Sequence, residues 1–305
     1  MISILEAIAP VFLIIAAGYA IRSRAMLPES FWAPVESITF WCFFPALLFY
    51  RTSTAQLAGL PLVEMLVALA AAIVVCGLLV VALVPAMKPS GPTFTTLLQG
   101  SIRSNVYIGL AAATGLFGAE GTALGAVAVA GMTPLVNFLS VVALARFGRS
   151  ERKPSARDVA KAVITNPIIV SVLCGFGLNL SGIELPRLAT ETVRILGAPS
   201  LPLALLAVGA GLDLATARQA GRQVLVSSAI KLLAMPLVAW AACLAMGVGP
   251  TPTTVVVLFA ALPTATSGYI MARKLGGDAR LMAAIISAQT VASAIFLPVV
   301  LILLR

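Results

Sequence analysis

Residues 98–109 read LQGSIRSNVYIG, and they place glycine, arginine and asparagine in the middle of an apolar run. A second stretch, residues 261–269, reads ALPTATSGY and sets Pro263 among small polar residues inside another apolar run. Proline cannot donate a backbone hydrogen bond and clashes with the preceding helical turn. Backbone groups freed at this depth in a membrane must line a polar cavity. The two stretches therefore predict two interrupted membrane helices.

The composition around these stretches is that of a membrane protein. Of the 305 residues, 60% are hydrophobic and 10% charged, with a mean hydropathy of +1.07. A soluble domain carries about 25% charged residues. Apolar runs of about 20 residues match the bilayer core, and ten recur, at residues 4–21, 32–50, 62–84, 94–117, 122–145, 162–180, 198–212, 224–246, 253–271 and 281–304. The sequence predicts an all-α protein with ten transmembrane helices, plus a short interfacial helix at residues 187–196.

The basic residues predict an orientation in the membrane. Fourteen of the twenty Lys and Arg fall in the connectors on one side and four on the other, while Arg103 and Lys231 fall within spans. By the positive-inside rule, both termini lie outside and the basic linker at residues 146–161 lies in the cytoplasm. We expect a multi-pass protein of the cell inner (plasma) membrane. The net charge of +9 does not form a basic face with aromatic residues, so no nucleic-acid partner is expected.

The chain offers little for catalysis or metal binding. It has no histidine, which removes the commonest general base and metal ligand. Its four cysteines fall inside apolar runs without a pairing pattern. We predict no catalytic residues, no metal and no cofactor. A membrane-embedded enzyme is the competing class, and a receptor or scaffold without transport is a third.

Five landmarks recur along the chain at offsets of 157 to 159 residues. They pair Pro10 with Pro167, Leu27-Pro28 with Leu185-Pro186, Pro45 with Pro202, Gly118 with Gly277, and Arg146 with Arg305. The alternative is coincidence, since Pro and Leu are common in membrane helices. The offset predicts two five-helix repeats, residues 1–145 and 162–305, and an odd number of spans inverts the second copy. Inverted repeats with broken helices are a transporter architecture.

Two basic residues within spans invite different interpretations. Arg103 lies in the fourth span, where a charge costs at least about 2.5–3.5 kcal/mol on insertion scales. Three roles are open for it: binding a substrate or gate, snorkelling to the cytoplasmic interface, or forming a structural ion pair. Lys231 lies near the cytoplasmic end of its span, and we expect it to snorkel.

The order and spacing of several motifs resemble the auxin efflux carrier family, which includes bacterial malonate and dicarboxylate carriers and plant PIN-type auxin exporters. The motifs are Pro10–Phe12 with Gly18-Tyr19, Phe44–Phe49, Asn105–Leu110, Asn137, Ala261–Pro263, and Gln289-Thr290 with Ser293 and Leu297-Pro298. Two features depart from the family pattern. Ala111 stands where the family often has proline, and Glu36 stands where a less charged residue is usual.

The resemblance implies a fold like that of sodium–proton antiporters and bile-acid transporters. Spans 1, 2, 6 and 7 would form a scaffold, often dimeric, and spans 3–5 and 8–10 a moving transport domain, with spans 4 and 9 crossing where they break. Asn105 and the residues after Pro263 would then take the substrate-binding role. The candidate substrate-binding residues are Arg103, Asn105, Tyr107, Asn137, Pro263, Thr264, Thr266, Ser267 and Gln289.

The function predicted from these features is secondary transport of a small organic anion, a carboxylate such as a dicarboxylate or an auxin-like molecule, by alternating access. Half-helix N-termini at the breaks present free N–H groups and partial positive charge, which suit an anion. The short hydroxyl residues Thr264, Thr266 and Ser267 could instead bond their own helix. A sodium- or proton-coupled symporter of the bile-acid-transporter type is the alternative. The identity of the anion, the direction of transport and the coupling ion stay open at this point.

Overall fold

The computed structural model describes residues 2–55, 59–149, 157, 161, 164–218 and 221–303. Every regular element in this part of the chain is helical. The elements, in chain order, are α1 (Ile2–Ser23), η1 (Glu29–Phe31), α2 (Trp32–Ile38), η2 (Thr39–Phe43), α3 (Phe44–Ser53), α4 (Leu62–Met87), α5 (Gly91–Ile102), α6 (Val106–Phe147), α8 (Pro167–Ser181), α9 (Arg187–Gly197), α10 (Ser200–Ala210), α11 (Leu214–Arg218), α12 (Arg222–Ala229), η3 (Ile230–Ala234), α13 (Met235–Ala245), α14 (Pro250–Ala261), α15 (Ser267–Leu275) and α16 (Ala279–Leu303).

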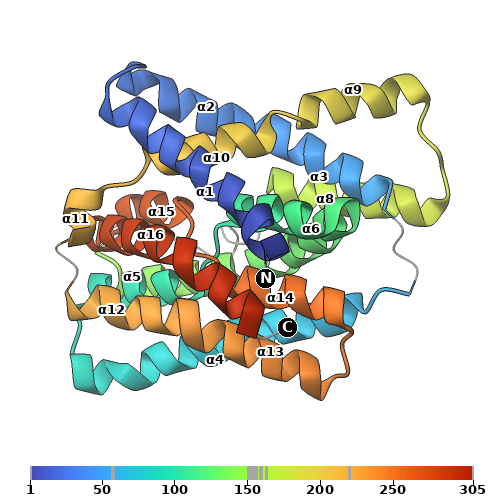
Figure 1. Ribbon diagram of the computed structural model, residues 1–305. Coiled ribbons are helices and arrows are strands. Elements are labelled where there is room, and N and C mark those ends of the chain that lie inside the picture. The colour runs from blue at the N-terminus through green and yellow to red at the C-terminus, as the bar shows by residue number, and fades with distance from the viewer. Residues whose placement is uncertain are drawn as a thin grey trace.

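The helices form two groups in space. Figure 1 shows α1, α2, α3, α9 and α10 along one side and α4, α12 and α13 along the opposite side. Within the first group α3 packs against α8 and α9, and α1 packs against α10. Within the second group α13 packs against α4 and α14, while the long helix α6 contacts members of both groups. Segments far apart in the sequence therefore pack side by side around the centre of the molecule.

Seven helical stretches in the described residues are long and apolar enough to cross a membrane. They are Ile4–Ser23, Glu29–Ser53, Leu62–Met87, Gly91–Phe147, Arg187–Ala210, Arg222–Ala245 and Ala279–Leu303. Two shorter apolar helices, Pro167–Ser181 and Pro250–Ala261, accompany them. The stretch Gly91–Phe147 has 57 residues and is itself divided into α5 and α6. The predicted all-helical membrane fold is confirmed at this level.

Helix α4 shows how the apolar sequence packs. Its buried side chains recur every three or four residues and so share one face: Met65, Ala68, Leu69, Ala72, Ile73, Cys76 and Val80. Its other face carries Val63, Val67 and Leu78, which are exposed although they are apolar. A helix that is apolar on all sides requires an apolar surrounding on its outer face. The outer face of α4 is therefore suited to lipid.

Two π-helical segments mark the places where proline follows. The segments η2 and η3 each end two residues before a proline, Pro45 and Pro236 respectively. A proline ring clashes with the carbonyl four residues earlier, and a wide π turn relieves this crowding while the helix continues. Such bulges also rotate the side chains that follow, and they often occur at functional sites. The segment η3 contains Lys231.

The structure corrects some predicted boundaries. The sixth apolar segment begins as a helix at Pro167 rather than at residue 162, because Asn166 caps it by accepting a hydrogen bond from the Ile168 amide at 3.0 Å. Residues 162 and 163, and most of the predicted linker at residues 146–161, lie outside the described residues. The expected boundary between the fourth and fifth segments is a bend within α6 at Gly118, whose φ of 59° suits glycine.

Candidate functional site

Both predicted interruptions are present. Helix α5 ends at Ile102, and the next helix begins at Val106 after an extended segment of which Arg103 has φ −81° and ψ 137°. Helix α14 ends at Ala261, and α15 begins only at Ser267. Each break exposes the C-terminal carbonyls of one helix and the N-terminal amides of the next. The chain therefore opens its backbone at two places in its interior.

The two breaks contact each other directly. The backbone amide of Asn105 donates to the carbonyl of Pro263 at 2.8 Å. The hydroxyl of Thr264 donates to the Gly100 carbonyl at 2.7 Å. Gln289 of α16 forms hydrogen bonds with both interrupted helices. Its Nε2 donates to the Gly100 carbonyl at 3.0 Å, and its Oε1 accepts from the Thr264 amide at 2.9 Å. The open backbone groups are thus satisfied by each other and by one buried amide side chain.

The close approach at the crossing requires glycine at position 100. A Cβ atom built on Gly100 would lie 2.6 Å from the Ser227 hydroxyl and 2.9 Å from Cγ2 of Ile285. Any side chain there would push α12 and α16 away from α5. The glycine that helped to predict the break therefore also lets three helices meet beside it.

Asn105 caps the helix that follows the first break. Its Oδ1 accepts from the Ile108 amide at 3.4 Å, as expected for an N-cap residue. Its Nδ2 is buried and has no hydrogen-bond partner, and the residue is only 1% exposed. A buried donor left without an acceptor is costly, so this amide group is an unsatisfied donor at the crossing.

Arg103 points into the protein between α6 and α15. Its Nη2 lies 3.1 Å from Asn137 Oδ1, 3.2 Å from the Ser140 hydroxyl and 3.0 Å from the Met271 sulfur, while Nη1 lies 3.3 Å from the Ser267 hydroxyl. Its Nε is buried without a partner. The residue is 7% exposed, so the guanidinium does not reach the interface by snorkelling. None of its described partners is acidic, which also leaves the ion-pair interpretation without support.

The expectation that Lys231 snorkels is wrong. Its side chain is fully buried, and its Nζ donates to the Ser104 hydroxyl at 2.7 Å and to the Ala260 carbonyl at 2.8 Å. The π segment η3 and the packing of Pro236 behind it place this residue on the inner face of its helix. The Lys231 nitrogen thus lies at the C-terminal end of α14 and donates to a carbonyl that the helix leaves open there.

The predicted site residues fall into separate groups. Asn105, Pro263, Thr264 and Gln289 meet at the crossing, whereas Arg103 gathers Asn137 and Ser267 beside it. The ring of Tyr107 instead packs edge-on against Phe44 of α3, with the ring centroids 4.6 Å apart.

Thr266 lies next to the start of α15, but its side chain makes no capping hydrogen bond there.

The sequence analysis did not predict two of the polar residues that contact Lys231 and Arg103, Ser104 and Ser140. Ser104 had no marked pattern of its own, whereas Ser140 lies three residues after Asn137 on the same helix face, a spacing that could have revealed it.

Comparison with known proteins supports transport. Residues 151–301 match the family model described as membrane transport protein. Over 298 residues the chain is 23% identical to an uncharacterized transporter from Methanothermobacter thermautotrophicus, and the match covers 96% of each chain. The fold and these matches point to a multi-pass membrane transport protein. These matches confirm the resemblance to the auxin efflux carrier family that was drawn from the motifs.

Proposed function

We propose that this protein is a secondary transporter that carries a small organic anion, a carboxylate, across the membrane by alternating access. The observation that carries the proposal is the pair of buried donors at the helix breaks. Asn105 Nδ2 and Arg103 Nε have no acceptor in the described structure. A carboxylate offers two oxygens that can accept from both kinds of donor.

The charges around the breaks favour an anion over a cation or a neutral molecule. Arg103 carries a permanent positive charge, and its described partners are all neutral. The N-termini of α6 and α15 add partial positive charge at the same place. In a low-dielectric interior such an arrangement is stabilised when an anion neutralises it.

The proposed mechanism needs one part of the molecule to move against another. We assign α1–α3 and α8–α10, from the predicted spans 1, 2, 6 and 7, to a scaffold, and the predicted spans 3–5 and 8–10 to the moving transport domain. The two helix groups seen in Figure 1, each packed mainly within itself, support this division.

The repeat organisation is part of the proposal. We propose ten spans arranged as inverted repeats of residues 1–145 and 162–305, joined by the linker at residues 146–161. Asn105 and Pro263, whose backbones are hydrogen-bonded, are separated by 158 residues, within the offset range of the sequence landmarks. Equivalent residues of two repeats can touch only where they lie close to the axis that relates the repeats, so this contact supports the inverted repeat.

The proposal includes an orientation in the membrane and a homodimer. Both termini lie outside the inner (plasma) membrane, the basic connectors lie in the cytoplasm, and the scaffold spans are available for a homodimer. The alternative of sodium- or proton-coupled symport concerns the driving force and uses the same anion site.

The test is a binding screen with matched neutral controls. Purified protein is heated with carboxylates and with their uncharged amides, for example malonate against malonamide and indole-3-acetate against indole-3-acetamide. At least one carboxylate should raise the melting temperature while its amide does not, and the same carboxylate should exchange across proteoliposomes. Equal stabilisation by both members of every pair would contradict an anion site.

A further inference from the structure

Lys231 is a buried amine that the proposed anion site does not use. Its Nζ donates to the hydroxyl of Ser104 and to the carbonyl of Ala260, and it lies 3.1 Å from the sulfur of Met235. All three partners are neutral. Ser104 itself donates to the Phe259 carbonyl at 3.0 Å. The amine is therefore joined to the crossing through a hydroxyl, without a countercharge of its own.

The helices around Lys231 do not supply that countercharge in the described residues. The segment η3 packs against α4, α5, α12, α13, α14 and α16. The titratable or charged residues on these elements are Glu64 and Cys76 of α4, Arg222 of α12, Cys243 of α13 and Arg280 of α16. Among these, the Cys76 thiol is fully buried on the inner face of α4. No carboxylate forms an ion pair with the amine in this part of the chain.

Lys231 and the proposed anion site lie on opposite sides of one short backbone segment. Arg103 and Asn105, on either side of Ser104, both have extended backbone dihedrals, and side chains alternate across an extended chain. Ser104 contacts Lys231, whereas the side chains of Arg103 and Asn105 bond other partners, in keeping with this alternation. An anion held by Arg103 and Asn105 would be close enough to Lys231 to act on its charge through the protein interior.

We propose that Lys231 couples anion transport to protons, taking up a proton when the anion binds at the crossing and releasing it when the anion leaves. This inference rests on the proposed function. Arg103 is permanently charged, so a second buried cation beside it is costly until an anion arrives. Binding supplies the missing negative charge and favours the ammonium form of Lys231. The proton comes from water on the side where the anion enters and leaves to water on the other side, so the two move together.

The experiment counts protons during binding. Malonate, succinate, benzoate and indole-3-acetate are titrated into the purified full-length protein by calorimetry, in two buffers with different ionisation enthalpies. The difference in heat gives the number of protons exchanged per anion. Wild type should take up as much as about one proton, the limit for a single group. Lys231→Arg should bind the same anion with no proton uptake, because its charge is permanent.

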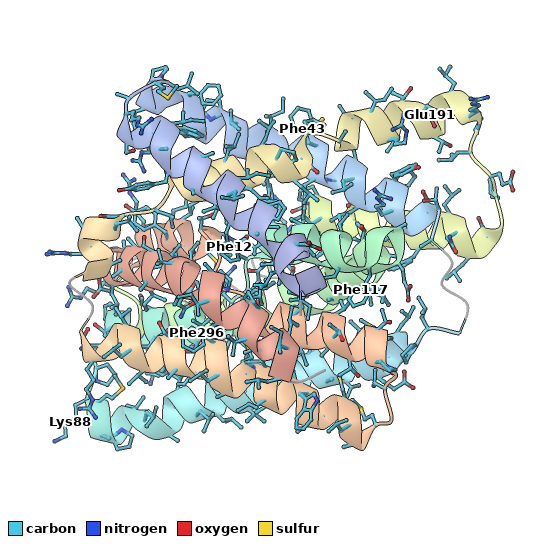
Figure 2. All side chains as sticks on the ribbon, viewed as in Figure 1. Phe12, Phe43, Lys88, Phe117, Glu191 and Phe296 are labelled. Atoms are coloured by element: carbon cyan, nitrogen blue, oxygen red, sulfur yellow. The ribbon has the colours of Figure 1, made fainter. Side chains whose placement is uncertain are left out.

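Three further variants separate coupling from folding. Lys231→Met removes the charge and should bind the anion more weakly, also without proton uptake. Cys76→Ala tests the neighbouring thiol and should leave proton uptake as in wild type. Lys88→Met removes a lysine that projects from the end of α4 (Figure 2) and should change neither binding nor proton uptake.

The possible outcomes test the proton coupling and the proposed anion transport separately. Binding by wild type without proton uptake would overturn the coupling and leave the anion site intact. Equal proton uptake by wild type and Lys231→Arg would place the proton on another group. Failure of all four anions to bind wild type would overturn the proposed function, and the coupling with it.

Discussion

The backbone amide of Asn105 and the carbonyl of Pro263 form a 2.8 Å hydrogen bond that joins the two interrupted helices. Both groups would be orphans if either helix broke alone, because each lies where an intrahelical partner is missing. Their pairing lets the chain open twice in its interior without leaving these backbone groups unsatisfied. The crossing therefore holds the buried donors of Arg103 and Asn105 on a backbone that hydrogen bonds already fix in place.

Replacing Arg103 should weaken carboxylate binding. A hydrogen bond to a charged group contributes about 1.5–3 kcal/mol, so Arg103→Ala should raise the dissociation constant by one to two orders of magnitude. Arg103→Lys should recover part of the loss, because it keeps the charge but not the planar fork. Calorimetric titration of equal amounts of folded protein measures both effects. Arg24→Ala, at an exposed position after α1, is the control and should bind like wild type.

Replacing Gln289 should lower the stability of the fold, because its side chain holds the crossing together. Its amide bridges the Gly100 carbonyl and the Thr264 amide, so Gln289→Leu leaves two buried polar groups with fewer partners. We expect a loss of about 1–3 kcal/mol in the free energy of unfolding, seen as a lower melting temperature. The Thr264 hydroxyl and the Gln289 amide both donate to the Gly100 carbonyl. The losses of stability caused by Thr264→Val and Gln289→Leu should therefore not be additive. Strict additivity would mean that the two side chains act independently.

The close approach at Gly100 can be tested with one methyl group. Gly100→Ala should destabilise the protein by about 1–3 kcal/mol, the usual cost of overpacking, because the new Cβ meets Ser227 and Ile285. The matched control is Gly177→Ala in α8, where nothing lies within 4 Å of the added atom. There alanine should be neutral or stabilising by about 0.5–1 kcal/mol. Thermal melts that show equal effects would contradict the packing at the crossing.

The orientation predicts opposite labelling at the two membrane faces. In a background without the native cysteines, Lys88→Cys should be protected from an impermeant thiol reagent in intact cells, because its connector is proposed to be cytoplasmic. Glu184→Cys, in the exposed connector between α8 and α9, should be labelled readily. Permeabilised cells should label both. The reverse pattern in intact cells would invert the proposed topology.

The sequence predicted the two breaks because their signals are local. Pro263 removes a donor and the small polar residues around it cannot face lipid, so the interruption follows from the residues themselves. Ala111, in place of the proline common in the family, suggested a weaker first break. The structure still interrupts that helix, although over fewer residues than at Pro263. The hydrogen bonds of the crossing provide the reason, since they satisfy the open backbone without a proline.

Lys231 shows what the sequence could not reveal. Its position near a span end indicated snorkelling, but snorkelling also depends on which face of the helix carries the side chain. That face is set by the π turn of η3 ahead of Pro236 and by packing against α4 and α14. Its immediate neighbours Ile230 and Leu232 are apolar, and the polar residues Ser227 and Ser228, one turn earlier, were the only hint of which face it lies on. The contacts of Ser104 could not be predicted either, because they join segments that are distant in the chain.

The most direct test of the anion site is the affinity of Asn105→Asp for the carboxylate that binds wild type. Aspartate keeps the oxygen that caps the Ile108 amide and is an equally good N-cap, so the helix should stay folded. It replaces the unpartnered Nδ2 donor with an oxygen that repels an anion. We expect a folded protein that no longer binds the carboxylate. A folded Asn105→Asp variant that binds it with wild-type affinity would contradict an anion site at the crossing.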